Sequence, residues 1–132
     1  TYTAAPGADP ALAGQMTISG ITYGSARWAQ AGYWVDQRWA GLGIAPTALA
    51  MAADYCFGVL RLHRLEVAIR PENGKSLRVA EKLGFRREGL IPRYLHVDGA
   101  WRDHVEHGLL PASRDLSLPV HPTQLYEAAL GS

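Results

Sequence analysis

Hydrophobic residues recur at two different spacings along the chain and together predict a mixed sheet with two helices. Leu65–Arg70 alternates between apolar and polar side chains, which is the clearest strand pattern in the chain. The segment from Ile44 to Leu60 instead carries apolar residues at the spacing of an amphipathic helix. Its apolar stripe consists of Leu49, Ala52, Cys56, Val59 and Leu60. An earlier strand at Gly32–Asp36, the helix and the strand at Leu65–Arg70 form a crossover, so the two strands should run parallel.

Weaker patterns place further elements on both sides of this crossover. Leu12–Tyr23 and Ala26–Asp36 indicate an antiparallel pair joined by a turn at Gly24–Ser25. After the parallel strand, Asn73 is a candidate N-cap for a helix at Lys75–Leu83, which should stop at Gly84. The other predicted elements are strands at Phe85–Glu88, Arg93–Val97 and Ala100–Leu110, a hairpin turn at Asp98–Gly99, a loop at Thr1–Pro10 and a short helix at Thr123–Leu130.

The composition narrows the class of protein. At 132 residues, 48% of them apolar and 19% charged, the chain has the size and balance of one soluble globular domain. A net charge of +1 without a basic stripe argues against direct binding to nucleic acid. The most apolar stretch, Ile44–Leu60, is interrupted by Pro46 and Asp54 and is too short to span a membrane.

The chain has a single cysteine, Cys56, which lies on the apolar stripe of the predicted helix. One cysteine excludes an internal disulfide and fits a reducing, cytoplasmic compartment. The local sequence supplies no base or positive neighbour that would activate the thiol. We therefore expect a small buried side chain rather than a reactive group.

A glycine-bearing loop precedes the first helix. Gly41 and Gly43 stand just before the helix start, where a bare backbone can approach a ligand closely. The first N–H groups of a helix lack partners within the helix, and together with the helix dipole they favour an anion, commonly a phosphate. Pro46 suits the first turn, because its missing N–H costs nothing there.

The loop belongs to a series of motifs spread along the chain. They are Gly32–Ala45, Leu62–Glu66, Pro71–Asn73, Ser76, Glu81–Gly89 and Asp98–His104. With them the chain resembles the GNAT acetyltransferase superfamily over Met16–Leu110. Within it the chain is most similar to the RimJ/RimL group, which acetylates the N-terminal amines of ribosomal proteins. The resemblance implies an acetyltransferase domain over residues 1–110, followed by a tail over residues 111–132.

The implied fold is α/β, with a mixed sheet that splays between Gly32–Asp36 and Leu65–Arg70 and has helices on its flanks. Acetyl-CoA would lie in the splay. The family's domain normally begins with a strand and a helical pair ahead of the segment near Met16, and these elements are expected to be missing here.

The resemblance also implies which residues bind acetyl-CoA. The loop would receive the pyrophosphate, and its contributing residues are Leu42, Gly43, Ile44, Ala45 and Thr47. The main chain of Trp34 and Val35 would pair with the pantetheine arm, although we favour ordinary core packing for the side chains of Trp34 and Tyr33. Asn73 would contact the cofactor, act as an N-cap, or do both. Ala40 and Leu42 depart from the basic or polar residues usual in this loop, and Arg38, Lys75 or Arg78 could replace the missing charge.

Two residues are candidates for the chemistry. Ser76 matches a serine that is thought to protonate the coenzyme A sulfur in RimL-like enzymes, with a first-turn helix residue as the alternative of equal weight. Glu66 could accept the amine's proton, although a solvated or salt-bridged glutamate is the favoured interpretation. His107 stands where the subgroup often has tyrosine, but a core or surface histidine is the better expectation. His104 and His107 point to opposite faces of a strand, so we expect no metal site.

The sequence thus predicts an acetyl-CoA-dependent N-acetyltransferase in which an amine attacks the thioester directly. Its acceptor is expected to be a protein or peptide N-terminus, with a polyamine or another small amine as the alternative. A non-catalytic module that binds coenzyme A is the alternative from a different class. The sequence predicts neither a membrane nor a direct nucleic-acid partner and leaves homodimerisation open.

Overall fold

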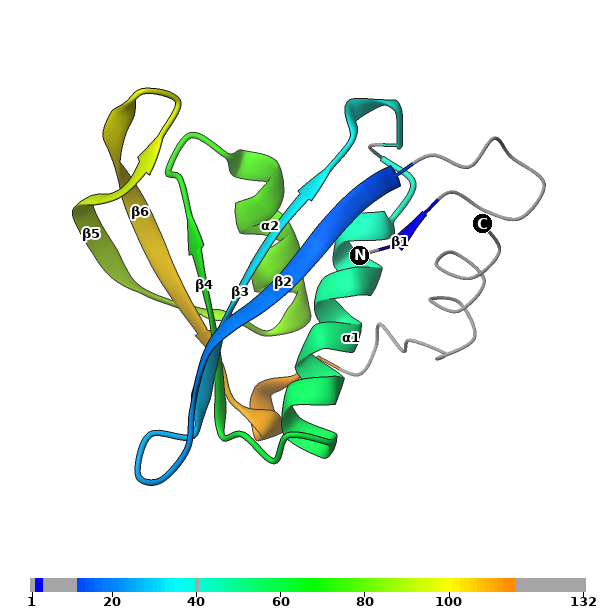
Figure 1. The fold of residues 1–132 in the computed structure, drawn as a ribbon, viewed down its shortest axis with the longest axis vertical. Coiled ribbons are helices and arrows are strands. Elements are labelled where there is room, and N and C mark those ends of the chain that lie inside the picture. The colour runs from blue at the N-terminus through cyan, green and yellow to red at the C-terminus, as the bar shows by residue number, and fades with distance from the viewer. Residues whose placement is uncertain (1, 4–11, 40, 116–132) are drawn as a thin grey trace.

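The computed structural model describes residues 2–3, 12–39 and 41–115, which form one mixed sheet with two helices (Figure 1). The sheet order is β1-β2-β3-β4-β6-β5. The strands are β1 (Tyr2–Thr3), β2 (Leu12–Thr22), β3 (Trp28–Val35), β4 (Arg64–Ile69), β5 (Arg86–Val97) and β6 (Ala100–Leu109). The helices are α1 (Ile44–Gly58) and α2 (Gly74–Leu83), with short 3₁₀ turns at Gln37–Trp39 and Pro111–Ser113.

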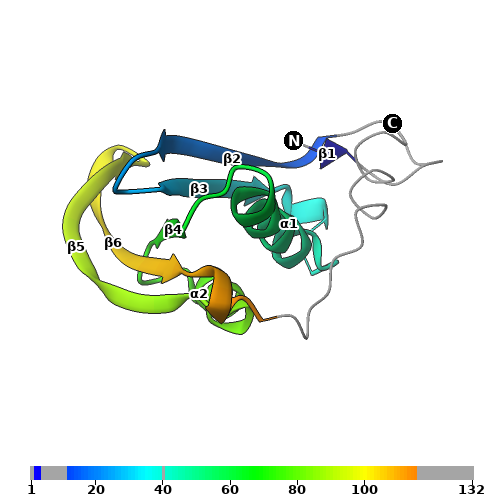
Figure 2. The same cartoon turned by 90° about the horizontal axis from the view of Figure 1, so that it is seen from below.

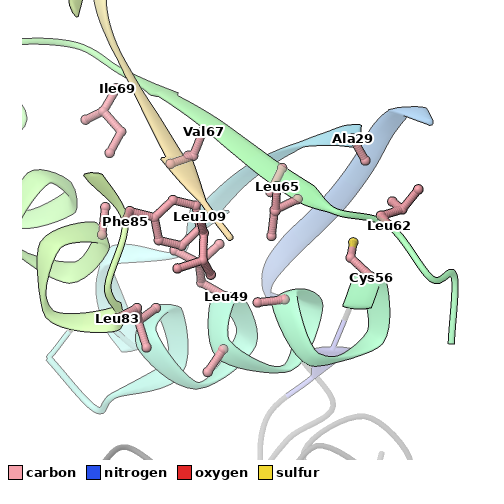
Figure 3. Packing of buried hydrophobic residues seen from close by; sticks show 14 residues of the cluster. Ala29, Leu49, Cys56, Leu62, Leu65, Val67, Ile69, Leu83, Phe85 and Leu109 are labelled. Atoms are coloured by element: carbon pink, nitrogen blue, oxygen red, sulfur yellow. The ribbon is translucent and has the colours of Figure 1, made fainter. Parts of the chain in front are cut away.

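Both helices pack together on one side of the sheet, which curls in the direction of β5 and β6 (Figure 2). Every second residue of β4 is buried, so the alternation at Leu65–Arg70 is confirmed as a strand with one face in the core. That face meets α1, α2 and β6 in a single apolar cluster (Figure 3). Cys56 belongs to the cluster and is fully buried, and this burial raises the pKa of its thiol to about 11.

β3 and β4 are parallel, as the crossover predicted, but they pair over only part of their length. The paired segment runs from Trp28 opposite Arg64 to Ala31 opposite Val67. Beyond Ala31, β3 continues for four residues that pair only with β2, while the end of β4 pairs with β6. The two strands therefore part in the middle of the sheet and diverge toward one end (Figure 1). This is the predicted splay.

The second helix is closed at both ends by the residues that the sequence indicated. The side-chain oxygen of Asn73 accepts a hydrogen bond from the Ser76 N–H at 3.3 Å and caps the first turn. Gly84 ends the helix with a φ of 102°, a left-handed conformation that favours glycine. These contacts place Asn73 and Ser76 side by side at the N-terminus of α2.

Two predictions about secondary structure and one about side-chain burial were wrong. Tyr2–Thr3 lies in the predicted terminal loop but forms a short strand against β2. β5 is one strand rather than two, because Pro92 falls on an edge strand, where a missing N–H is tolerated and the register shifts between Ile91 and Leu95. Trp34, expected in the core, is 48% exposed. The helix predicted at Thr123–Leu130 lies outside the described residues.

The start of the predicted tail packs against the domain. Arg114 is buried and donates to the Asp54 carboxylate on α1 at 3.2 Å. The Asp115 N–H donates to the Leu83 carbonyl oxygen at 2.9 Å. Within the described part of the chain, no helix is both long and apolar enough to cross a membrane.

Candidate functional site

The loop before α1 presents bare backbone to open space. Gly41 and Gly43 have φ angles of 82° and 78°, which a residue with a side chain rarely adopts. Gly43 is the N-cap of α1, and no side chain in the described ranges makes a capping hydrogen bond at this helix end. A Cβ atom built on Gly43 would meet nothing within 4 Å. Gly43 therefore presents bare backbone to the adjoining space.

That space is a pocket of about 600 Å³ between the end of β3 and the N-termini of both helices. We call it the loop pocket. Seven of the predicted site residues line it: Trp34, Val35, Gly43, Ile44, Ala45, Asn73 and Ser76. Leu42 and Thr47 are not among its lining residues. Leu42 is 67% exposed, and the Thr47 N–H is already used within the helix, where it donates to the Gly43 carbonyl oxygen at 3.1 Å.

One of the three expected replacements for the missing loop charge lines the pocket. Arg38 instead pairs with Asp36 at 3.0 Å, and its hydrogen bonds lower the pKa of the Asp36 carboxyl. Arg78 lies close to Gly74 on α2. Lys75 lines the loop pocket and can therefore place a positive charge near an anion held there.

A second, smaller pocket of about 180 Å³ lies where β3 and β4 part. We call it the splay pocket. It is lined by Gly32, Tyr33, Val67, Ala68, Ile69, Arg70, Asn73, Ser76, Val97 and His104. Tyr33, Asn73 and Ser76 line both pockets. These three residues, which we call the junction, therefore border both pockets, close to the point where β3 and β4 part.

Tyr33 is the residue at this junction that the sequence did not single out. It packs against the apolar core, as expected for its side chain. Its hydroxyl is nevertheless a buried polar atom beside Ser76, and no described residue makes a well-formed hydrogen bond to it. Burial raises the pKa of the Tyr33 phenol, and the Ser76 hydroxyl offsets part of that rise. The only signal in the sequence was strand alternation, which points Tyr33 to the opposite face from Trp34.

Glu66 and His107 do not line either of these pockets. The Glu66 carboxylate accepts a hydrogen bond from Arg64 Nε at 2.7 Å, which matches the salt-bridged alternative. The role of Glu66 in proton transfer stays a prediction. His107 is fully buried on the helix side of β6, with Nδ1 3.3 Å from the Val105 carbonyl oxygen, as expected for a core histidine.

His104, in contrast, lines the splay pocket and is 4% exposed. From the sequence, His104 had been considered only as a metal ligand together with His107. Among the described residues, no three His, Cys, Asp or Glu side chains come together in a group that could hold a metal ion. The chemistry available is therefore that of a hydroxyl pair and an amide at the junction and of an imidazole in the splay pocket.

Comparison with known proteins places this geometry among acetyltransferases. A family model described as "Acetyltransferase (GNAT) domain" matches residues 5–86. The structure of Mycobacterium smegmatis RimJ in complex with CoA-disulfide superposes with a TM-score of 0.74 at 43% identity, over 90% of this chain and 57% of that one.

Two curated relatives carry named acceptors. The [ribosomal protein uS5]-alanine N-acetyltransferase of Escherichia coli is 35% identical over 94 residues, which are 71% of this chain and 48% of the relative. The spermidine N(1)-acetyltransferase of Escherichia coli is 32% identical over 71 residues, which are 54% of this chain and 38% of the relative. The chain spans about half the length of the first of these and less of the second.

Proposed function

Because the chain belongs to the GNAT acetyltransferase family, we propose that it transfers the acetyl group of acetyl-CoA to a primary amine, namely the N-terminal α-amine of a protein. The observation that carries this proposal is that the two pockets share the lining residues Tyr33, Asn73 and Ser76. A bisubstrate transfer needs two spaces that converge on one reacting centre, since holding the reactants together removes much of the entropic barrier.

The loop pocket suits acetyl-CoA. Its volume of about 600 Å³ is within the range of small-molecule sites, and the N-terminal end of α1 suits a pyrophosphate. Backbone groups of Gly43, Ile44 and Ala45 would bind the phosphates, with Lys75 supplying charge. Leu42 would contribute through its main chain and Thr47 through its hydroxyl.

The edge of β3 suits the pantetheine arm. Beyond Ala31 this strand has no β4 partner, so the main chain at Trp34 and Val35 can pair with an extended ligand as an added strand would. An N–H on that edge would also stabilise the oxyanion that forms when the thioester carbonyl is attacked. Asn73, at the junction, would contact the arm near its reactive end.

Ser76 is proposed to protonate the thiolate that leaves. Its side chain lies at the junction beside the buried Tyr33 hydroxyl. The Tyr33 phenol is neutral at pH 7, because its ordinary pKa is 10.0 and burial raises that pKa further. It can therefore donate a hydrogen bond to Ser76 while Ser76 donates to sulfur. Burial without a settled partner fits a group whose hydrogen bond is completed when substrate arrives.

The lining of the splay pocket favours a protein N-terminus over a polyamine. Arg70 is its one fully charged lining residue, and no carboxylate is among the lining residues in the described part of the chain. A polycation would gain from carboxylates at several points, whereas a single α-amine needs only one proton acceptor. A small amine is the second candidate, which the spermidine-acetylating relative supports. A cytoplasmic location fits both acceptors and the single buried cysteine.

The test is an assay of thiol release from acetyl-CoA with three acceptors. These are a peptide with a free N-terminal alanine, the same peptide blocked at its N-terminus, and spermidine. We expect release with the free peptide only. Turnover with spermidine alone would show that the acceptor is a polyamine rather than a protein N-terminus. Binding of acetyl-CoA without turnover on any amine would indicate a non-catalytic module.

The binding arm of the test uses two matched glycine substitutions. Acetyl-CoA should raise the melting temperature of the parent protein, since a ligand that binds only the folded state stabilises it. Gly43→Asp should abolish this shift by placing a negative charge at the phosphate position. Gly24→Asp is the control, because Gly24 has the same left-handed φ, 79°, and open surroundings but lies in the β2–β3 turn. Equal shifts in both variants would show that the loop does not bind the phosphates.

A further inference from the structure

His104 occupies a position in the splay pocket that the activity described so far leaves unused. Val105, its neighbour on β6, pairs with Ile69 on the helix side of the sheet. By alternation His104 points to the opposite face of the sheet. It is 4% exposed and lines the same space as Ser76.

The contacts of the ring fix which nitrogen carries the proton. Nδ1 lies 3.0 Å from the Arg102 carbonyl oxygen, and a carbonyl can only accept a hydrogen bond. Nδ1 is therefore the protonated nitrogen of the neutral ring, and Nε2 carries the lone pair. The Tyr94 ring meets the imidazole edge-on at a centroid distance of 6.0 Å, and Gln30 Nε2 donates to the Tyr94 hydroxyl at 3.3 Å. The ring is thus held from two strands.

We propose that His104 is the general base of the transfer, with Nε2 accepting the proton that the acceptor ammonium must lose, directly or through one water. The inference rests on the proposed function, because it needs an amine in the splay pocket. Glu66 is the weaker candidate, since its carboxylate is bonded to Arg64 and it is not among the lining residues.

The protons and bonds of the step balance. Nε2 takes one proton from R–NH₃⁺, which leaves a neutral amine whose lone pair forms the new bond to the thioester carbon. The carbon–sulfur bond then breaks, and its electron pair leaves on sulfur, which takes a proton through Ser76. The amide nitrogen loses its remaining extra proton to solvent, and His104 returns its own proton there. The products are the acetylated amine, free coenzyme A and one proton.

The groups around the ring come from β3, the end of β4, β5, the start of α2, and β6 itself. From β3 the pocket receives Tyr33, whose phenol pKa is raised by burial. Arg70, which directly follows β4, lines the same pocket, but its guanidinium is paired with Glu72 at 2.6 Å and Asp98 at 3.2 Å. From β5 the neighbour is Tyr94, and from α2 the pocket receives the uncharged Asn73 and Ser76. On β6 itself, Arg102 and Glu106 point to the same face as His104. The pH dependence of the step must be interpreted with these groups in mind.

The test variant is His104→Asn, because an asparagine amide can keep the hydrogen bond to the Arg102 carbonyl while removing the base. General base catalysis is worth about 10²–10⁴-fold. We expect kcat with the free peptide to fall about 100-fold at pH 7, with an unchanged acetyl-CoA melting shift. The acidic limb of the parent's kcat–pH profile should disappear from the variant. His96→Asn is the control, since His96 is exposed on the same hairpin and packs against Trp101 outside the pocket.

Each outcome decides the assignment. A kcat of His104→Asn within threefold of the parent value overturns the role of His104 while the proposed function stands. An acidic limb that is retained in His104→Asn and lost in Glu66→Gln does the same. If His104→Asn does not fold, His104→Gln takes its place. A parent kcat–pH profile without an acidic limb overturns the role without any variant. If the parent transfers acetyl to no amine, the proposed function falls and this role falls with it.

Discussion

Replacing Glu106 by glutamine should stabilise the protein at high pH and leave its stability at low pH unchanged. Glu106 lies on β6 opposite Ala68, and its Oε1 atom is buried without a hydrogen-bond partner among the described residues. Burial raises the pKa of this carboxyl to about 7, and the charge of Glu66 adds to the rise. Arg64 acts in the opposite direction but is held by Glu66 and Glu88.

The magnitude follows from the difference between the folded and unfolded protein. A rise from the ordinary 4.5 to about 7 corresponds to about 3 kcal/mol at 1.36 kcal/mol per pKa unit. Solvent screening at a half-buried carboxyl reduces this to about 1–2 kcal/mol. Between these two pH values the folded state binds more protons than the unfolded state, so the free energy of unfolding falls as the pH rises. Glutamine resembles the protonated form at every pH and avoids that loss.

The assay is urea unfolding of the parent and Glu106→Gln at pH 4 and pH 8. The two proteins should agree at pH 4, and the variant should be about 1–2 kcal/mol more stable at pH 8. Glu81→Gln, at an exposed position of α2, is the matched control for removing one carboxylate from the surface. A constant difference between parent and Glu106→Gln at both pH values would refute the assignment of a buried, raised carboxyl.

Two further predictions concern Ser76 and Gly14. Ser76→Ala should lower kcat about 100-fold with unchanged acetyl-CoA affinity, because the lost proton donor acts mainly in the transition state; a loss below about threefold would leave Ser76 a helix residue only. Gly14→Ala should destabilise the protein by about 1–3 kcal/mol, because its Cβ would collide with the Trp34 carbonyl oxygen on β3. Urea unfolding measures this, with Gly32→Ala as the control whose Cβ meets nothing within 4 Å, and equal stability of the two variants would contradict the close approach.

Local signals in the sequence predicted those elements that are stabilised locally. The alternation at Leu65–Arg70 and the capping residues Asn73 and Gly84 each act within a few residues of the element that they define. The division of β5 into two predicted strands was wrong, because a local pattern does not show that Pro92 lies on an edge strand, where proline is tolerated. Trp34 misled because its aromatic character predicted burial, while its indole turns outward and donates to Gln15 at 3.4 Å.

The site was predictable where it depends on the loop and its helix. Gly43, Ile44 and Ala45 line the loop pocket, and their role in binding phosphates stays a prediction. The junction and the splay pocket could not be predicted, because β3, α2 and β6 come together only after the sheet has assembled and β3 and β4 have parted. Tyr33 and His104 are separated by more than half of the described chain, and no local pattern connects them. Only the register of β3 and β4 shows that the gap between them opens at Ala31.

The two pockets share three lining residues but are otherwise lined by different elements, and this affects how the substrate specificity of such an enzyme can diversify. Under the proposed function, α1 and its loop bind the donor acetyl-CoA, whereas the acceptor contacts the hairpin of β5 and β6 through Val97 and His104. Substitutions on the hairpin can then change the accepted amine without lowering the affinity for acetyl-CoA. A lineage could exchange one nitrogen nucleophile for another by altering a wall that the donor never contacts. The parting of β3 and β4 thus separates the residues of the acetyl-CoA site, which must be kept, from the residues of the acceptor site, which are free to vary.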